Sequence, residues 1–227
     1  MKKLFPALAL LILASCKEEP KQENKTMLKK ETVAPIKAEV MKDAPYTEFK
    51  PDKISDLKIK GFDIEQAFSV EGNRVVAGNF QFTDGKITLP DTEEDFGKRL
   101  LLLNHKNEII YQSQGSGDAY LYEPYFYKNS QNGTIIIVCQ QAYEYFFGGD
   151  AYLLEKGKIK YLGNLDIEPN NEEKKLTDIL RVKESGNGIT FSFDSDSLVL
   201  KPGSDDITIK NNDVKYVYDY RSLKLYK

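Results

Sequence analysis

The sequence is poor in the residues on which most enzyme active sites depend. Its 227 residues include no tryptophan, one histidine (His105) and two cysteines, Cys16 and Cys139. A single histidine excludes zinc sites built from several histidines, and it leaves a Ser-His-Asp triad only if His105 is the base. No Gly-x-Ser-x-Gly segment, the turn that presents the serine of α/β-hydrolases, is present. His105 lies between Asn104 and Lys106, where we expect a solvated turn.

The chain also lacks an apolar run long enough to cross a membrane. A spanning helix needs about 20 apolar residues, whereas the apolar run at residues 4–13 is followed within four positions by Lys17. Two lysines precede this run and two small residues follow it. Residues 1–16 therefore have the layout of a secretory signal.

Two short motifs follow this apolar run. Residues 13–16, Leu-Ala-Ser-Cys, resemble the lipobox of bacterial lipoproteins. The resemblance implies that the chain is cut before Cys16 and that its sulfur carries lipid, a stable anchor when several acyl chains are attached. Lys17-Glu18-Glu19 is similar to the export signal of Bacteroidota surface lipoproteins. Together they imply an outer-membrane lipoprotein on the cell surface, with the periplasmic face as the alternative.

The composition changes sharply near residue 45. Residues 17–45 hold seven lysines and five glutamates but no glycine and no aromatic side chain. Such a segment has too little apolar surface to offset its ordering entropy, so we expect a solvated tether. The predicted organisation is a signal at residues 1–15, a lipidated cysteine and tether at 16–45, and one β domain at 46–227.

The expected domain is mildly acidic. Residues 46–227 contain 23 Lys and Arg against 29 Asp and Glu, which leaves a net charge of −6. Because the basic residues are scattered, no nucleic-acid partner is predicted. Cys139 lies in an apolar run typical of a buried strand and has no disulfide partner once Cys16 is lipidated. We predict no cofactor.

Short runs rich in Val, Ile, Tyr, Phe and Thr alternate with Asn, Asp and Gly turns through the whole domain. This pattern predicts an all-β, antiparallel up-and-down meander of hairpins. The expected strands are 66–71, 74–83, 86–90, 99–104, 108–113, 120–128, 134–141, 151–155, 158–163, 178–184, 188–194, 206–210, 214–219 and 222–226.

A faint repeat suggests how these strands are grouped. Similar strand–turn–strand segments end at Tyr111, Tyr161 and Tyr216, which are 50 and then 55 residues apart. The implied unit is four up-and-down strands. We favour two packed sheets, and the alternative is a small propeller-like array of these units.

One five-residue segment occurs twice and suggests a ligand site. Gly-Asp-Ala-Tyr-Leu is found at residues 117–121 and again at 149–153. A single strand separates the two strands that these segments begin, so both begin at the same edge. We expect Asp118, Tyr120, Asp150 and Tyr152 to form a binding rim, with each pair on one face of its strand. The alternative is that each aspartate bonds its own turn and each tyrosine is buried.

Ten aromatic residues crowd into residues 120–152. Alternation along the expected strand places Tyr143, Tyr145 and Phe147 on one face, where an exposed row could stack on a glycan or a peptide. Tyr145 is therefore added to the candidate binding residues. The alternative is that these rings fill the core.

Acidic pairs give no clear metal site. The pairs Asp194/Asp196 and Asp205/Asp206 lack the glycine and the distal glutamate of an EF-hand loop, so we expect solvated turns and no metal. The sequence thus predicts a membrane-anchored binding protein for an unknown protein or glycan ligand, and not an enzyme. An envelope inhibitor or immunity protein and a carboxylate-based hydrolase are the alternatives.

Overall fold

The computed structural model describes residues 43–83, 86–87, 95–201 and 206–227. These residues belong to one compact unit, Val40–Lys227, and they form nineteen strands and one short helix. Cys16, the predicted export signal, most of the predicted tether and Asp205 lie outside the described residues. In the described part of the chain, no helix is both long and apolar enough to span a membrane.

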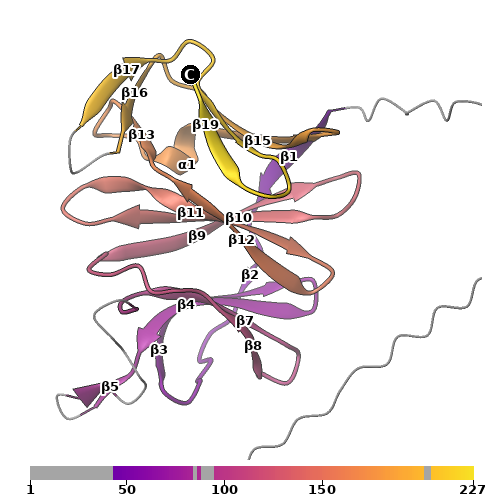
Figure 1. Cartoon of the computed structure of the whole chain (residues 1–227). Helices are drawn as coiled ribbons and strands as arrows, with labels where there is room; N and C mark the ends of the chain where they lie inside the picture. Colours follow the sequence, from indigo (N-terminus) through magenta and orange to yellow (C-terminus); the bar gives the residue numbers. More distant parts are fainter. Residues whose placement is uncertain (1–42, 84–85, 88–94, 202–205) are drawn as a thin grey trace, which may run out of the picture. The chain divides into compact units, whose positions relative to one another are not determined.

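Twelve of the described strands form three antiparallel units of four, and in each unit the strands pair in chain order. In Figure 1 the strands β3, β4, β7 and β8 lie at the bottom and β9 to β12 lie in the middle. The first unit consists of β3 (Phe62–Val70), β4 (Asn73–Phe80), β7 (Arg99–Leu103) and β8 (Ile109–Gln112). The second consists of β9 (Leu121–Asn129), β10 (Ile135–Ala142), β11 (Phe146–Glu155) and β12 (Lys158–Leu165). The third consists of β14 (Leu180–Ser185), β15 (Gly188–Phe193), β18 (Lys215–Tyr218) and β19 (Leu223–Tyr226).

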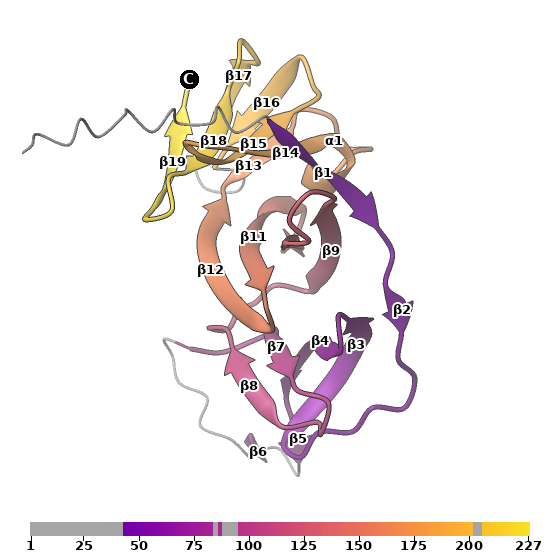
Figure 2. The same ribbon diagram turned by 90° about the vertical axis from the view of Figure 1, so that its right-hand side faces the viewer.

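One N-terminal segment pairs with the first strand of each of the three units. Strand β1 (Ala44–Phe49) pairs with both β9 and β14, and β2 (Asp52–Lys53) pairs with β3. Figure 2 shows this segment running along one side of the units. Because β1 lies between β9 and β14, the second and third units become one nine-stranded sheet, while β2 extends the first unit to a five-stranded sheet.

The remaining elements are short. Strands β13 (Ile167–Pro169), β16 (Ser197–Leu200) and β17 (Ile207–Lys210) form a three-stranded sheet, and β5 (Phe82–Thr83) pairs with β6 (Lys86–Ile87). The helix α1 (Leu176–Ile179) precedes β14, and both Leu176 and Ile179 are buried in the core beside β13.

The second unit lies between two hydrophobic cores. On one side Ile135, Ile137 and Tyr152 pack against Val75 and Leu102 of the first unit. On the other side Ile136 and Val138 share a core with the third unit, α1 and β13. Every residue of β10 is consequently buried, and burying one such Ile or Val side chain contributes about 1.5–3 kcal/mol.

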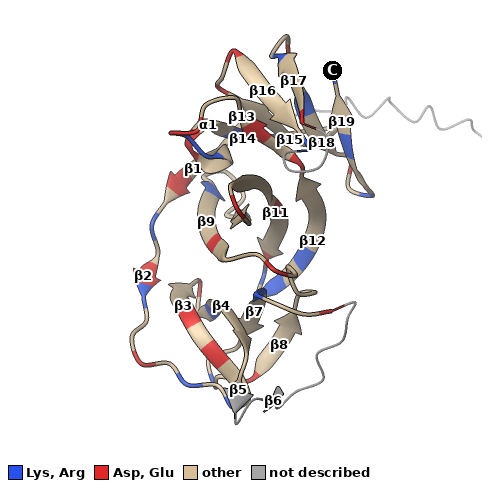
Figure 3. Ribbon diagram, turned by 90° about the vertical axis from the view of Figure 1, so that its left-hand side faces the viewer, with Lys and Arg blue, Asp and Glu red and all other residues tan. Residues whose placement is uncertain are grey.

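The predicted all-β meander is confirmed, including the packing of one sheet on another. The unit implied by the repeat, in which the segment ending at Tyr111 joins the next hairpin, is not formed, because β8 and β9 lie in different sheets. The prediction of equivalent repeat segments is wrong for the copy that ends at Tyr216, because that segment joins β17 to β18, which lie in different sheets. Four strands were not predicted: β1, β2, β13 and β16. Figure 3 shows lysine and arginine spread over all three units, as their scatter in the sequence indicated.

Candidate functional site

A hollow of about 480 Å³ opens where the first and second units meet. It contains Asp150, so we call it the Asp150 hollow. Its walls come from β8, β10, β11, β12 and the loop that precedes β9. The residues that line it are Phe96, Tyr111, Ser113, Gln114, Gly115, Ser116, Gly117, Gln141, Tyr143, Phe147, Asp150, Tyr152, Tyr161 and Asn164.

The Asp150 carboxylate is held by four neutral hydrogen-bond donors. Its Oδ1 accepts bonds from the Tyr161 hydroxyl at 3.0 Å and from Asn164 Nδ2 at 3.1 Å. Its Oδ2 accepts bonds from the Tyr122 hydroxyl and from Gln141 Nε2, both at 3.1 Å. All four donors come from β9, β10 and β12, so each strand of the second unit contributes to the fixed position of this carboxylate.

The strand register explains how these donors converge. Asp150 pairs with Asn164 on β12, and Tyr122 pairs with Gln141 on the neighbouring strands β9 and β10. The ladder between β11 and β12 then slips by one residue, because Ala151 pairs with Gly163 but Tyr152 pairs with Tyr161. Such a bulge shifts the alternation of side chains. It brings Tyr161 to the face that carries Asn164, although the two are three residues apart.

Among the described residues that line the hollow, Asp150 is the one charged side chain. Burial raises the pKa of Asp150, while the hydrogen bonds from Asn164, Tyr161 and Tyr122 act in the opposite direction and favour the carboxylate. No lysine or arginine of the described chain forms an ion pair with it. The negative charge therefore has no internal counter-ion within the described part.

Aromatic rings line two sides of the hollow. The ring centroids of Tyr111 and Tyr152 are 6.4 Å apart, and those of Tyr152 and Tyr161 are 5.3 Å apart. Tyr143 and Phe147 form a further edge-to-face pair at 5.1 Å. Burial, with the nearby Asp150 charge as a second cause, raises the pKa of Tyr111, Tyr143, Tyr152 and Tyr161, so these phenols remain neutral.

A glycine-rich loop forms the wall that the first unit supplies. Gly115 N donates to Asp95 Oδ1 at 2.7 Å, and the Tyr143 hydroxyl donates to the Ser116 carbonyl at 2.8 Å. A Cβ atom on Gly97 would lie 1.9 Å from the carbonyl oxygen of Gly117. Only glycine permits this close approach of two backbone segments, so the shape of the wall depends on it.

Four of the five predicted binding residues line two separate hollows, and the fifth, Asp118, lines neither. Asp150 and Tyr152 line the Asp150 hollow, where Tyr152 is buried and its hydroxyl lies 2.7 Å from that of Tyr122. Tyr120 and Tyr145 are exposed and line a different hollow of about 520 Å³. Asp118 is exposed.

The two Gly-Asp-Ala-Tyr-Leu segments are not equivalent in the fold. Strands β9 and β11 do run in the same direction, but the residue of β9 level with Asp150 is Pro124, six residues beyond Asp118. Gly117 has a positive φ of 63°, whereas Gly149 lies within β11. Asp118 and Asp150 therefore do not occupy equivalent positions, and Asp118 does not line the Asp150 hollow.

The expected row of Tyr143, Tyr145 and Phe147 on one strand face is also wrong. Strand β11 begins at Phe146, so Tyr143 and Tyr145 lie in the bend between β10 and β11. Tyr143 turns toward Phe147 in the Asp150 hollow, while Tyr145 is exposed outside it.

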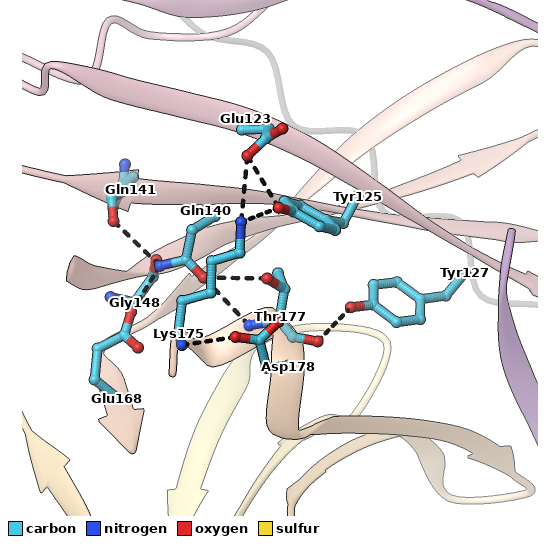
Figure 4. Close-up of polar contacts among 10 residues, drawn as sticks. All are labelled: Glu123, Tyr125, Tyr127, Gln140, Gln141, Gly148, Glu168, Lys175, Thr177 and Asp178. Carbon is cyan, nitrogen blue, oxygen red and sulfur yellow. Dashed lines mark hydrogen bonds and ion pairs between the residues drawn. The ribbon is translucent and has the colours of Figure 1, made fainter. Parts of the chain in front are cut away.

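A second buried acid lies on the opposite face of β10. Glu168 is 4% exposed, and its Oε1 accepts bonds from Gly148 N at 2.6 Å and from Gln140 Nε2 at 2.7 Å. Gln140 Oε1 in turn accepts a bond from Thr177 N at 3.2 Å, which connects β10, β13 and α1 (Figure 4). Burial raises the pKa of Glu168 to about 7.

The predicted surroundings of His105 and Cys139 agree with the structure. His105 is exposed in the turn between β7 and β8. Cys139 is completely buried, and burial raises the pKa of its thiol. Asp194 forms an exposed ion pair with Arg181 at 2.9 Å. Within the described ranges, no group of three or more His, Cys, Asp or Glu side chains could hold a metal ion.

Sequence reasoning missed Tyr122, Gln141, Tyr161 and Asn164, which hold Asp150. One signal was present: Gln140 and Gln141 are consecutive amides that end the apolar run of β10. Neighbouring strand residues face opposite sides, so two buried amides there require a polar partner on each side. Those partners are Glu168 for Gln140 and Asp150 for Gln141.

Comparison with known proteins gives no relative from which a role for these residues could be taken. The chain matches no protein-family model, no curated protein and no solved structure. The arrangement supplies one fixed negative charge, several neutral donors and a set of aromatic rings around a hollow that a small molecule can enter.

Proposed function

We propose that this chain is a lipid-anchored protein of the outer membrane whose β domain binds a small extracellular ligand in the Asp150 hollow. The observation that carries the proposal is the fixed carboxylate within an aromatic hollow of about 480 Å³. Small-molecule sites are typically hollows of this size, largely apolar, with a few precisely placed polar groups.

The state of the carboxylate favours binding over catalysis. A carboxylate has about four lone-pair positions, and Asp150 uses four to accept bonds from its neutral neighbours. A general base or a nucleophile needs a free position from which to take a proton or attack. Asp150 is instead suited to supply a stationary charge.

The N-terminal motifs suit the same role. Lipid on Cys16 would hold the chain on the membrane, and Lys17-Glu18-Glu19 would direct it to the cell surface. Residues 17–45, as a flexible tether, would have an end-to-end distance of about 30 Å. The hollow would therefore be presented to solutes outside the cell.

Capture of small molecules tests this proposal. We expect the detergent-purified chain, equilibrated with the small-molecule fraction of spent growth medium and re-isolated, to retain a compound detectable by mass spectrometry. Tyr161→Ala removes one ring of the hollow and should reduce retention at least tenfold, whereas Tyr226→Ala should not. The two tyrosines are 47% and 46% exposed, so the pair is matched. Equal retention by wild type and Tyr161→Ala would refute the proposed site.

A further inference from the structure

The Asp150 hollow combines a negative charge with aromatic side chains and contains no positive charge among its described residues. Six of its lining residues are aromatic: Phe96, Tyr111, Tyr143, Phe147, Tyr152 and Tyr161. Aromatic faces attract cations within about 6 Å of the ring centroid, most strongly where water is excluded. The Asp150 charge adds to that attraction and repels anions.

We propose that the ligand of this hollow carries a quaternary ammonium group. The proposal rests on the proposed function, because it names the chemical class of the ligand bound at the same site. The positive head lies beside Asp150 and against the rings of Tyr111, Tyr152 and Tyr161.

Elsewhere in the protein, a carboxylate and a tyrosine ring together hold the ammonium group of a lysine. Lys175 Nζ lies 4.5 Å from the ring centroid of Tyr125 and 3.3 Å from a carboxylate oxygen of Glu123, and it also contacts the Tyr125 hydroxyl (Figure 4). A carboxylate and a tyrosine thus hold a cation at this place. In the Asp150 hollow the carboxylate and the tyrosines are present, but the described chain supplies no cation.

The occupied lone pairs of Asp150 select the type of cation. A primary ammonium or a sugar hydroxyl binds a carboxylate by donating a hydrogen bond, so it must displace one of the four donors already in place. A quaternary ammonium has no N–H group to donate and needs only the charge and the ring faces. The structure therefore favours a methylated ammonium over a primary amine or a polyol.

Isothermal titration of the detergent-purified full chain tests this with three probes. Choline carries the quaternary head, 3,3-dimethylbutan-1-ol has the same shape without the charge, and ethanolamine has a primary ammonium. We expect choline to bind at least tenfold more tightly than either of the others, since desolvated cation–ring attraction of about 2 kcal/mol corresponds to roughly a thirtyfold change.

Substitutions then locate the charge and the ring. Asp150→Asn should abolish the preference for choline over its neutral analogue, while Asp118→Asn, an exposed aspartate outside the hollow, should keep it. Tyr161→Phe should retain choline binding because the ring remains, and Tyr161→Leu should weaken it at least fivefold. Tyr161 is half exposed, so the Tyr161 pair tests the site even if Asp150→Asn fails to fold.

Three results would overturn the inference. No choline binding at 50 mM, equal affinity for the neutral analogue, or tighter binding of ethanolamine would each exclude a quaternary ammonium site. If the capture experiment still yields a compound that depends on Tyr161, the hollow remains a ligand site for another class of molecule. If capture also fails, the proposed function fails with it.

Discussion

Replacing Cys16 with serine should move the protein from the membrane fraction to the soluble fraction. The Leu-Ala-Ser-Cys segment at residues 13–16 resembles a lipobox, and only the cysteine sulfur would carry the lipid. Each buried CH₂ contributes about 0.8 kcal/mol, so the loss of several acyl chains removes far more free energy than residual surface contacts can replace. The measurement is ultracentrifugation of lysed cells followed by immunoblotting.

The matched control is Cys139→Ser. Cys139 is fully buried in β10, so this variant should stay with the membranes. A Cys16→Ser protein that still pellets would contradict the lipid anchor. Replacing Lys17-Glu18-Glu19 with alanines while keeping Cys16 should leave the protein in the pellet but protect it from protease added to whole cells. Unchanged cleavage would contradict surface export alone.

Glu168→Gln should remove a large pH dependence of stability. Burial raises the pKa of Glu168 from 4.5 to about 7 in the folded protein. Below the unfolded value the side chain is neutral in both states, so burial of charge costs nothing. As the pH rises from the unfolded to the folded value, the unfolded state ionises while the folded state keeps its proton, so the wild type has lost about 3 kcal/mol once the pH passes the folded value. Glutamine is neutral throughout and lacks this loss.

Urea denaturation at pH 4, 6 and 8 measures the effect. The free energy of unfolding of Glu168→Gln minus that of the wild type should rise by about 3 kcal/mol between pH 4 and pH 8. The control is Glu155→Gln, at the exposed end of β11, for which the difference should change by less than about 0.5 kcal/mol. If the difference in unfolding free energy between Glu168→Gln and the wild type does not change with pH, burial does not raise the pKa of Glu168.

The local patterns of the sequence predict most of the strands. Alternating apolar residues and turns such as residues 131–133 identify the hairpins of all three units, because a hairpin is closed by neighbours in the chain. Strand β1 is not predicted by these local patterns. Its sequence, Ala-Pro-Tyr-Thr-Glu-Phe, is short and contains a proline, and its pairing partners β9 and β14 lie far along the chain. Pairing at such separation leaves no local signature.

The candidate site is predicted only in part for the same reason. Repetition of Gly-Asp-Ala-Tyr-Leu draws attention to Asp150 and Tyr152, which line the hollow, yet identical segments need not occupy equivalent positions. The register of β9 and β11 places Pro124, not Asp118, level with Asp150. Tyr161 reaches Asp150 only through the bulge between β11 and β12. Neither register nor bulge can be read from composition or spacing.

The most direct test of the central claim is to observe the tyrosines of the Asp150 hollow while ligand is added. The protein is labelled with 3-fluorotyrosine, its ¹⁹F signals are assigned by Tyr→Phe substitution, and choline is titrated in. We predict that the signals of Tyr111, Tyr152 and Tyr161 shift together and saturate, while that of Tyr226 stays unchanged. A saturating shift confined to tyrosines outside the hollow, or no shift at all, would contradict binding of a quaternary ammonium group beside Asp150.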